Sequence, residues 1–202
     1  MFKRSSVLAI LFITLAAGGV AYPDTQDERS LLLDDFSRSD GQSRVSTRWE
    51  GFTDRVMGGR SDMQAWVEPT EDGRVLRMTG RVSLENNGGF IQVRLPLSPA
   101  GSFDAREWRG VAVTARADSD DLDRYYLHLR TDRTRLPWSH YEQKLPVTRE
   151  WRRLELPFSG FEPRNMLGRA APDSSRLRSV AVVAGKADFT ADIQVRSIEL
   201  YR

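Results

Sequence analysis

The sequence predicts an all-β protein, a jelly-roll β-sandwich, and three observations carry this prediction. About ten short segments alternate apolar and polar side chains with the period of two that is typical of half-buried strands. Clusters of glycine, proline, asparagine and aspartate separate these segments. No segment of about twelve residues or more has the 3.6-residue apolar period of a helix. Strands without helical partners bury their apolar faces by packing two sheets together.

The first half of the chain holds four candidate strands, residues 31–36, 63–68, 75–84 and 89–95. The first two are short runs with apolar residues. The third alternates most clearly, because Leu76 and Met78 share one face and Arg77 points to the other. The fourth has apolar side chains at Phe90 and Val93.

The second half holds further candidate strands, residues 108–117, 125–131, 140–145, 151–156, 179–184 and 193–201. Residues 125–131 place Tyr125 and Leu127 opposite Tyr126 and His128. We expect residues 140–145 and 151–156 to pair with each other. We expect much of the core to come from alternating aliphatic side chains: Val111, Val113, Ala115, Leu127, Leu129, Val180, Val182, Ile193, Val195, Ile198 and Leu200.

Residues 1–21 have the layout of a secretory signal peptide. Lys3 and Arg4 precede an apolar run, and Gly19 and Ala21 supply small residues before the expected cleavage point. The run is shorter than the roughly 20 residues that a spanning helix needs, and an uncleaved N-terminal anchor is the alternative. The sequence therefore predicts a polar leader over residues 22–30, a single sandwich domain over residues 31–202, and export to the periplasm or the medium.

Charge and composition exclude several classes of function. Residues 1–21 hold two basic residues and no acidic one, so their removal changes the net charge from +2 to 2 − 2 = 0. A neutral chain with interleaved charges is not typical of a nucleic-acid-binding protein, whose affinity depends on neutralising phosphates. The chain has no cysteine. This absence excludes disulfides, thiol catalysis and cysteine-ligated zinc.

Motifs for catalysis are also absent. The sequence has no GxSxG, HExxH, Walker or GxGxxG pattern and no evident pair of facing carboxylates. His128 and His140 lie on candidate neighbouring strands and could bind a metal together with Glu142. We favour the interpretation that they are outward-facing strand residues. We therefore predict a protein that is not an enzyme and has no catalytic residues, no metal ligands and no cofactor.

Two glycine-rich segments stand out, TDRVMGGRSD at residues 53–62 and LENNGGFIQVRL at residues 84–95. Asn-Gly between two alternating runs is a strong hairpin signal. Asn87 and Gly88 are therefore expected to turn the chain from the strand that ends near Val82 into the strand that holds Phe90. Gly58 and Gly59 are expected to form a tight connection with unusual φ angles.

Together these segments resemble the complex I intermediate-associated protein family, whose NADH:ubiquinone oxidoreductase intermediate-associated domain is galactose-binding-like. The first family motif matches Trp49, Asp54, Val56, Met57, Gly58, Gly59 and Ser61. The second matches Gly80, Val82, Ser83, Glu85, Asn86, Asn87, Gly88, Gly89 and Phe90. The resemblance covers about residues 31–202 and includes Trp151, LPFSGFEP at residues 156–163 and the final IELY.

The resemblance implies a galactose-binding-like β-sandwich, similar to many non-catalytic carbohydrate-binding modules. It also implies an assembly factor that binds a protein partner, since the family's namesake holds intermediates of respiratory complex I in mitochondria. Residues 1–21 resemble a secretory signal rather than an arginine-rich amphipathic transit peptide. The fold and the motif are therefore implied more directly than the mitochondrial role.

If the glycine segments lie side by side, Asp54 is expected to accept hydrogen bonds from backbone N–H groups near Gly58 and Gly59. Asn86 and Asn87 would do the same from the other segment. This corner would be structural if its side chains only satisfy backbone groups, and functional if it presents its residues to a protein partner. The candidate partner-binding residues are Trp49, Asp54, Arg55, Met57, Gly58, Gly59, Arg60, Ser61, Glu85, Asn86, Asn87, Gly88, Gly89 and Phe90.

A second candidate surface is an aromatic sheet face that would bind a sugar. Its residues are Tyr126, His128, Arg130, Trp138 and His140. Trp138 at the sandwich edge is the structural alternative. Asp34, Asp35 and Glu199 could hold a structural calcium. The sequence thus favours an exported, non-catalytic binding domain with a protein partner in the cell envelope, and a carbohydrate-binding module is the alternative.

Overall fold

The computed structural model describes residues 29–136, 138–166 and 171–202. Twelve strands make up almost all of the regular structure of this part of the chain: β1 Ser30–Asp34, β2 Glu50–Thr53, β3 Gln64–Thr70, β4 Gly73–Val82, β5 Phe90–Pro96, β6 Gly110–Ala117, β7 Tyr125–Thr131, β8 His140–Lys144, β9 Arg152–Pro157, β10 Glu162–Arg164, β11 Leu177–Gly185 and β12 Phe189–Tyr201. The helical elements are short 3-10 turns: η1 Asp54–Met57, η2 Glu85–Asn87, η3 Leu122–Arg124, η4 Phe158–Gly160 and η5 Ser174–Arg176. Among the described residues, no helix has the length and hydrophobicity needed to cross a membrane.

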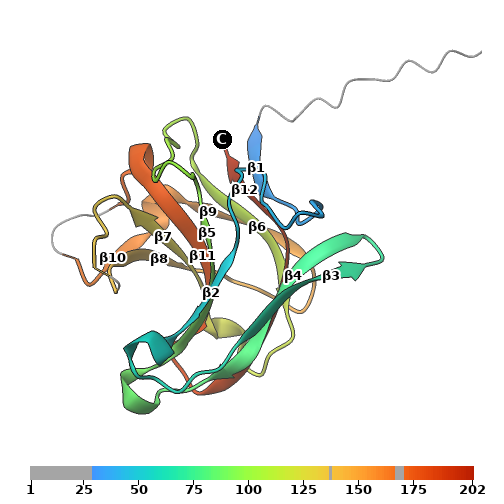
Figure 1. The fold of residues 1–202 in the computed structure, drawn as a ribbon, viewed down its shortest axis with the longest axis vertical. Coiled ribbons are helices and arrows are strands. Elements are labelled where there is room, and N and C mark those ends of the chain that lie inside the picture. Colours follow the sequence, from blue (N-terminus) through green and yellow to red (C-terminus); the bar gives the residue numbers. More distant parts are fainter. Residues whose placement is uncertain (1–28, 137, 167–170) are drawn as a thin grey trace, which may run out of the picture.

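The strands form two six-stranded antiparallel sheets. The first sheet has the order β3-β4-β12-β6-β9, and β1 also pairs with β12. The second sheet has the order β10-β8-β7-β11-β5-β2. Figure 1 shows them packed face to face, with β8 and β10 on the left and β3 and β4 on the right. The predicted all-β sandwich is confirmed.

The core lies between the sheets and follows the predicted alternation. On β7, Tyr125, Leu127 and Leu129 are fully buried, and the residues between them face outward. The aliphatic residues expected in the core all belong to the buried cluster. Burial of each large aliphatic side chain contributes about 1.5–3 kcal/mol relative to exposure, and this term stabilises the sandwich without any disulfide.

The ten expected strands are all present, with ends that differ from the expected ones by a few residues. Two short strands, β2 and β10, were not expected. Both are edge strands of the second sheet, and β10 contains Pro163, which cannot donate to a ladder. The expected pairing of residues 140–145 with 151–156 is wrong. β8 pairs with β7 and β10 in the second sheet, whereas β9 pairs with β6 in the first.

The hairpin expected at Asn87-Gly88 is also wrong. β4 pairs with β3 and β12, whereas β5 pairs with β11 and β2, so the connection crosses from one sheet to the other. The special backbone geometry is nevertheless present. Asn86 and Asn87 both have φ of 57°, and Gly89 has φ of 125°. These positive φ angles redirect the chain across the sandwich edge.

The signal peptide expected for residues 1–21 lies outside the described residues, as does most of the expected leader. The described chain begins with Arg29, directly before β1.

Candidate ligand-binding groove

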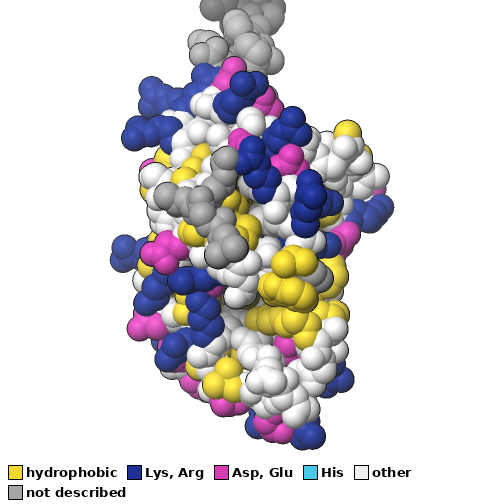
Figure 2. All heavy atoms as spheres, turned by 90° about the vertical axis from the view of Figure 1, so that its left-hand side faces the viewer, with side chains coloured by type: hydrophobic (Ala, Val, Ile, Leu, Met, Phe, Trp, Pro, Cys, Tyr) yellow, Lys and Arg dark blue, Asp and Glu magenta, His cyan; other side chains and the backbone are white. Residues whose placement is uncertain are grey.

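An open groove of about 440 Å³ runs over the outer face of the second sheet. Its floor is β5, β11, β7 and β8, and β2, η1 and the segments around Trp138 and Asn165 form its rim. Figure 2 views the molecule from the side of β8 and β10 and shows hydrophobic side chains gathered on this face, with arginine and lysine around them. The volume is within the range of about 300–1,000 Å³ that is usual for ligand sites.

Strand alternation positions the groove side chains. On β5, Ile91 and Val93 enter the core, and Gln92 and Arg94 therefore face the groove. On β7 the same alternation turns Tyr126, His128 and Arg130 outward, as their sequence pattern predicts. Small residues of β11 lie between these strands and form the floor: Ser179, Ala181, Val183 and Gly185.

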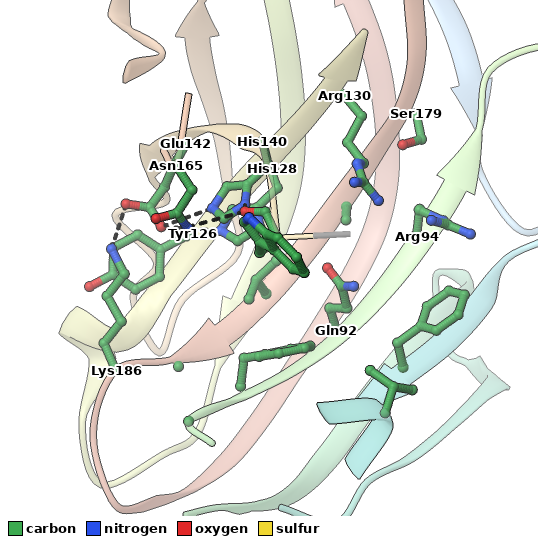
Figure 3. A pocket seen from close by; sticks show the side chains of 18 of the residues that line it. Gln92, Arg94, Tyr126, His128, Arg130, His140, Glu142, Asn165, Ser179 and Lys186 are labelled. Carbon is green, nitrogen blue, oxygen red and sulfur yellow. Dashed lines mark hydrogen bonds and ion pairs between the residues drawn. The ribbon is translucent and has the colours of Figure 1, made fainter. Parts of the chain in front are cut away.

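Two arginines lie at one end of the groove, close to Ser179 (Figure 3). Arg94 forms an ion pair of 2.6 Å with Glu50 and packs over the ring of Phe52, with 4.5 Å between the guanidinium carbon and the ring centroid. Arg130 donates a hydrogen bond to the carbonyl of Leu136. Burial lowers the pKa of Arg130, and the positive charge of Arg94 nearby lowers it further. This end of the groove therefore has two guanidinium groups in its lining.

A buried carboxylate lies at the other end. Glu142 on β8 is 4% exposed. Its Oε1 pairs with Lys186 Nζ at 2.5 Å and with Arg164 Nε at 3.1 Å, and its Oε2 lies 3.2 Å from His128 Nε2. Burial raises the pKa of Glu142, but hydrogen bonds from His128, His140 and Lys186 outweigh burial and hold the pKa well below its ordinary value. Glu142 is therefore an ionised acceptor.

The two histidines stack on each other beside Glu142. Their ring centroids are 3.9 Å apart with an interplanar angle of 14°. Burial lowers the pKa of His128 to about 4, so this imidazole is neutral at pH 7. His140 Nδ1 lies 3.0 Å from the carbonyl oxygen of Trp138, which fixes the orientation of the ring. The prediction that these are outward-facing strand residues agrees with their position on the groove face of β7 and β8.

These three residues are the groove's one candidate set of metal ligands in the described part of the chain. The ligand atoms of His128, His140 and Glu142 lie within 4.8 Å of one another. Two features disfavour a metal. Parallel stacked rings direct their lone pairs along parallel planes rather than toward one point, and two cations already neutralise the carboxylate. The absence of metal ligands in this protein remains a prediction.

Aromatic side chains frame the groove. Trp138 is half exposed at the rim, and its carbonyl accepts a hydrogen bond of 3.3 Å from Asn165 Nδ2. Tyr126 lies on the floor with the Lys186 ammonium 4.1 Å from its ring centroid. Phe90 and Phe52 line the opposite side. Trp138 thus lies at the groove as the aromatic-face hypothesis expects, with its indole accessible to a ligand.

The two glycine segments do lie side by side, and Asp54 joins them. Asp54 is fully buried. Its carboxylate accepts hydrogen bonds from Ser61 N at 3.0 Å, Ser61 Oγ at 2.5 Å, Gly89 N at 2.6 Å and Phe90 N at 3.3 Å. Burial raises the pKa of Asp54, but these hydrogen bonds outweigh burial and keep the pKa below its ordinary value. Asp54 thus has the geometry of a structural anchor.

The donors to Asp54 differ from the expected ones. Gly58 N and Gly59 N donate instead to the backbone carbonyls of Arg55 and Asp54. Asn86 is a donor rather than an acceptor, because its Nδ2 lies 3.4 Å from the carbonyl oxygen of Gly58. Carbonyl groups of the 3-10 turn η1 accept hydrogen bonds from the N–H groups of the two glycines that follow it, Gly58 and Gly59. This local pairing leaves the carboxylate of Asp54 available to bind the other segment.

Two of the motif glycines are required by their contact with Asp54. A Cβ on Gly59 would lie 2.3 Å from Asp54 Cγ, and one on Gly88 would lie 2.5 Å from Asp54 Oδ2. Gly58 is different, because a Cβ there would meet nothing within 4 Å, but its φ of 91° is in the left-handed region.

The motif residues divide between this corner and the groove. Met57, Gly89 and Phe90 line the groove, together with Val56. Val56 is 71% exposed and Met57 is 49% exposed. Charged and polar residues of the motifs form contacts within the first segment and between the two segments. Arg55 Nε donates to the Ser61 carbonyl at 2.9 Å, and Arg60 pairs with Glu85 at 2.8 Å.

Trp49 lies away from the groove. Its indole N–H donates to Asp34 Oδ2 at 2.8 Å, and its ring packs on Phe36 with centroids 5.8 Å apart. The three residues considered for calcium are each engaged by other side chains. Asp34 accepts from Trp49, Asp35 pairs with Arg44, and Glu199 accepts from Arg153. A structural calcium remains a prediction.

Several groove residues were not identified from the sequence: Phe52, Gln92, Arg94, Asn165, Ser179 and Lys186. Gln92 and Arg94 carried a usable signal, because they alternate with Ile91 and Val93 on a strand that was correctly expected. Asn165 and Lys186 lie in connections with positive φ, at 53° and 71°, and no sequence pattern indicates where such side chains point.

Solved carbohydrate-binding modules have a similar fold. The family 11 carbohydrate-binding module of a cellulosomal cellulase of Clostridium thermocellum aligns with a TM-score of 0.65 and 16% identity, over 85% of this chain and 94% of that one. The family 11 module of Clostridium thermocellum in complex with a β-1,3-1,4-mixed-linked tetrasaccharide aligns with a TM-score of 0.61 and 15% identity. This alignment covers 86% of this chain and 94% of the module. The crystal structure of an agarase aligns with a TM-score of 0.54 and 13% identity, over 85% of this chain and 26% of the agarase chain. At these identities the likeness shows the fold.

Sequence comparison identifies the family. The sequence model for complex I intermediate-associated protein 30 matches residues 35–186, which is most of the chain. No curated protein sequence matches it significantly. The resemblance inferred from the two glycine motifs is thus confirmed, and the chain belongs to the complex I intermediate-associated protein 30 family.

Proposed function

We propose that this member of the complex I intermediate-associated protein 30 family binds a glycan in the groove of its second sheet and does not cleave it. The observation that carries the proposal is the half-exposed indole of Trp138 at the rim of a groove lined by both apolar and polar side chains. Sugar rings have apolar faces that stack on aromatic side chains, and hydroxyl groups at their edges that need hydrogen-bond partners.

The polar side chains of the groove offer both hydrogen-bond donors and hydrogen-bond acceptors to sugar hydroxyls. Gln92 and Asn165 carry amides that donate and accept, and Ser179 carries a hydroxyl. Glu142 is ionised and accepts, whereas Arg94 and Lys186 donate. Their ion pairs and aromatic contacts hold several of these side chains in place before any ligand arrives, and this lowers the conformational entropy cost of binding.

The charge distribution does not suit glycoside cleavage. Glycosidases use two carboxyl groups that face each other across the scissile bond. Among the described residues that line the groove, Glu142 is the only carboxylate. Its depressed pKa keeps it ionised at neutral pH, and an ionised carboxylate cannot act as a general acid. A binding role therefore fits the groove better than hydrolysis.

The structural relatives support the same class of ligand. Carbohydrate-binding modules share this sandwich, and one of them is described in complex with a mixed-linked tetrasaccharide. The export signal expected over residues 1–21 agrees with this function, because it would deliver the domain to the periplasm or the medium.

The test compares two exposed tryptophans, one at the groove rim and one on the first sheet. Trp138 is 50% exposed at the groove, and Trp66 is 37% exposed on β3 of the first sheet. The chain and its Trp138→Ala and Trp66→Ala variants are applied to a glycan array, and the affinities of hits are measured by calorimetry. We expect Trp138→Ala to weaken binding at least about tenfold and Trp66→Ala to leave it unchanged. Retained binding in Trp138→Ala would remove the groove assignment.

A protein partner is the second candidate, and one observation favours it. Val56 and Met57 are among the most exposed large hydrophobic residues described, and they lie beside each other at the groove rim. Exposed apolar side chains of this kind often mark interaction sites. The partner would be met in the cell envelope if the expected export signal operates. The family's description as intermediate-associated agrees with a role in assembly.

The two candidates are separated by a paired variant. Val56→Ser with Met57→Ser removes the apolar rim and disturbs none of the hydrogen bonds of Asp54. If a partner is bound, this variant should fail to capture it from an envelope extract, while Trp138→Ala still captures it. Equal capture by the parent and by the paired variant would contradict the second candidate.

A further inference from the structure

Two arginine side chains flank the central strand β11 on the groove face of the sheet. Arg94 on β5 is in register with Ala181, and Arg130 on β7 is in register with Ser179. Because β11 separates β5 from β7 and the two positions are offset by two residues along it, the two arginines rise about 12 Å apart from the same face of the sheet. The residues between them are small, so a space remains above β11. Figure 3 shows both guanidinium groups at this end of the groove, beside Ser179.

Among the described residues that line the groove, this end has two arginines, and the one carboxylate of the lining, Glu142, lies at the other end. The pKa of Arg130 is lowered by its burial and also by the charges of Arg94 and Arg178. Arg94 forms an ion pair with Glu50, with 2.6 Å between the guanidinium nitrogen and the carboxylate oxygen. Glu142 lies at the other end of the groove, where Lys186 and Arg164 already pair with it.

We propose that Arg94 and Arg130 bind an anionic substituent, a carboxylate or a sulfate ester, on a sugar unit of an acidic glycan. This inference rests on the proposed function and names its ligand class. A guanidinium group presents two parallel N–H donors that match the paired oxygens of a carboxylate or a sulfate. Gln92 and Ser179 border the same space and supply hydrogen bonds to the hydroxyls of that sugar unit.

The arginines are held in position for this role. Arg94 packs over the ring of Phe52 at 4.5 Å and pairs with Glu50, and both contacts restrict its side chain. Arg130 is anchored by the Leu136 carbonyl in the segment that leads to Trp138. An anion bound between them would therefore adjoin the sugar unit that stacks on the indole. The indole and the two arginines would therefore bind successive sugar units of one glycan.

The experiment uses matched pairs of oligosaccharides that differ only in charge. One pair is oligogalacturonate and its methyl ester, and the other is a sulfated galactan oligosaccharide and its desulfated form. Affinities are measured by calorimetry for the full chain. We expect the charged member of one pair to bind about tenfold more tightly, which corresponds to about 1.4 kcal/mol. The pair that shows the preference identifies the anion, and added salt should reduce the preference.

Two variants locate the effect. Arg94→Gln should reduce the preference to about threefold or less. Arg106→Gln is the matched control, because Arg106 is exposed, does not line the groove and, like Arg94, forms an ion pair with a carboxylate, that of Asp104. It should leave the preference intact. An equal loss in both variants would show long-range attraction and overturn the subsite.

The remaining outcomes separate the two proposals. Equal binding of charged and neutral members would overturn the anionic subsite and leave glycan binding in place. Tighter binding of the neutral members would do the same. No binding of these oligosaccharides, with no hit on the glycan array, would overturn both proposals.

Discussion

Asp54 is a single side chain on which two distant segments depend. It is fully buried, and it pairs with backbone N–H groups of Gly89 and Phe90 and with Ser61. The sequence predicted that an aspartate here would satisfy backbone donors, because tight turns leave such donors unpaired. It could not identify the donors, because the contact between residues 54 and 89 depends on how the sheets pack.

Asp54→Ala should lower the free energy of unfolding by about 3 kcal/mol, because it leaves several buried donors without an acceptor. Asp62→Ala is the matched control. Asp62 lies in the same segment, is exposed, and accepts only a long hydrogen bond of 3.3 Å from Arg81 N. We expect it to change stability by less than about 1 kcal/mol. Urea unfolding measures both variants, and similar losses in the two would contradict the structural role of Asp54.

His128 and Glu142 make stability depend on pH. The folded pKa of His128 is about 4, below its ordinary value of 6.5, so the unfolded chain takes up this proton first as pH falls. The contribution of His128 to the free energy of unfolding is therefore complete above pH 6.5 and is lost as pH falls toward 4. Glu142 acts in the same direction, because its folded pKa lies below its ordinary value of 4.5. Its contribution is present above pH 4.5 and is lost below.

We therefore expect Tm to fall steadily between pH 6.5 and pH 4, before general acid unfolding. His128→Gln keeps a hydrogen-bond donor for Glu142 but removes the titrating ring, so its Tm should depend less on pH in this window. Thermal unfolding followed by circular dichroism at half-unit pH steps measures both proteins. Parallel curves for the two would show that His128 does not contribute the dependence.

At the level of elements, the two glycines that follow the turn η1 are needed for different reasons, Gly59 for lack of space and Gly58 for its backbone conformation. Gly59→Ala places a Cβ against the carboxylate of Asp54, whereas Gly58→Ala meets only open space and backbone strain. The strain should cost about 1–2 kcal/mol, and the collision should cost more. In an Asp54→Ala background the cost of Gly59→Ala should shrink, because the two residues are in contact. A double-mutant cycle by urea unfolding would contradict this if the costs simply add.

The existence of strands was predictable, but their partners were not. Alternation of apolar residues is a local property, and it identified ten strands, including β7 with its two faces. Pairing is not local. Residues 84–90 carry the strong Asn-Gly signal of a hairpin, yet they cross between sheets, since β4 pairs with β12 and β5 pairs with β11. Edge strands such as β2, with four residues that include a glycine, are too short to show a pattern.

At the level of the whole molecule, three residues of the glycine motifs, Met57, Gly89 and Phe90, line the same groove as the predicted sugar-binding face. The crossover from β4 to β5 brings Gly89 and Phe90 to the outer face of the second sheet, where β7 and β8 present the two histidines. Trp138 completes the rim. The residues of each surface could be identified from local patterns, but their convergence depends on the strand order. The sequence favoured a protein partner, and the groove gives stronger support to a glycan.

The most direct test of glycan binding in this groove is an NMR titration of the isotope-labelled chain with the best oligosaccharide from the array. Glycan binding at the proposed site predicts that amide shifts change on β5, β7, β8 and β11 and around Trp138, and stay constant on β3, β4 and β9 of the first sheet. Changes confined to the first sheet, or no changes at saturating glycan, would contradict it.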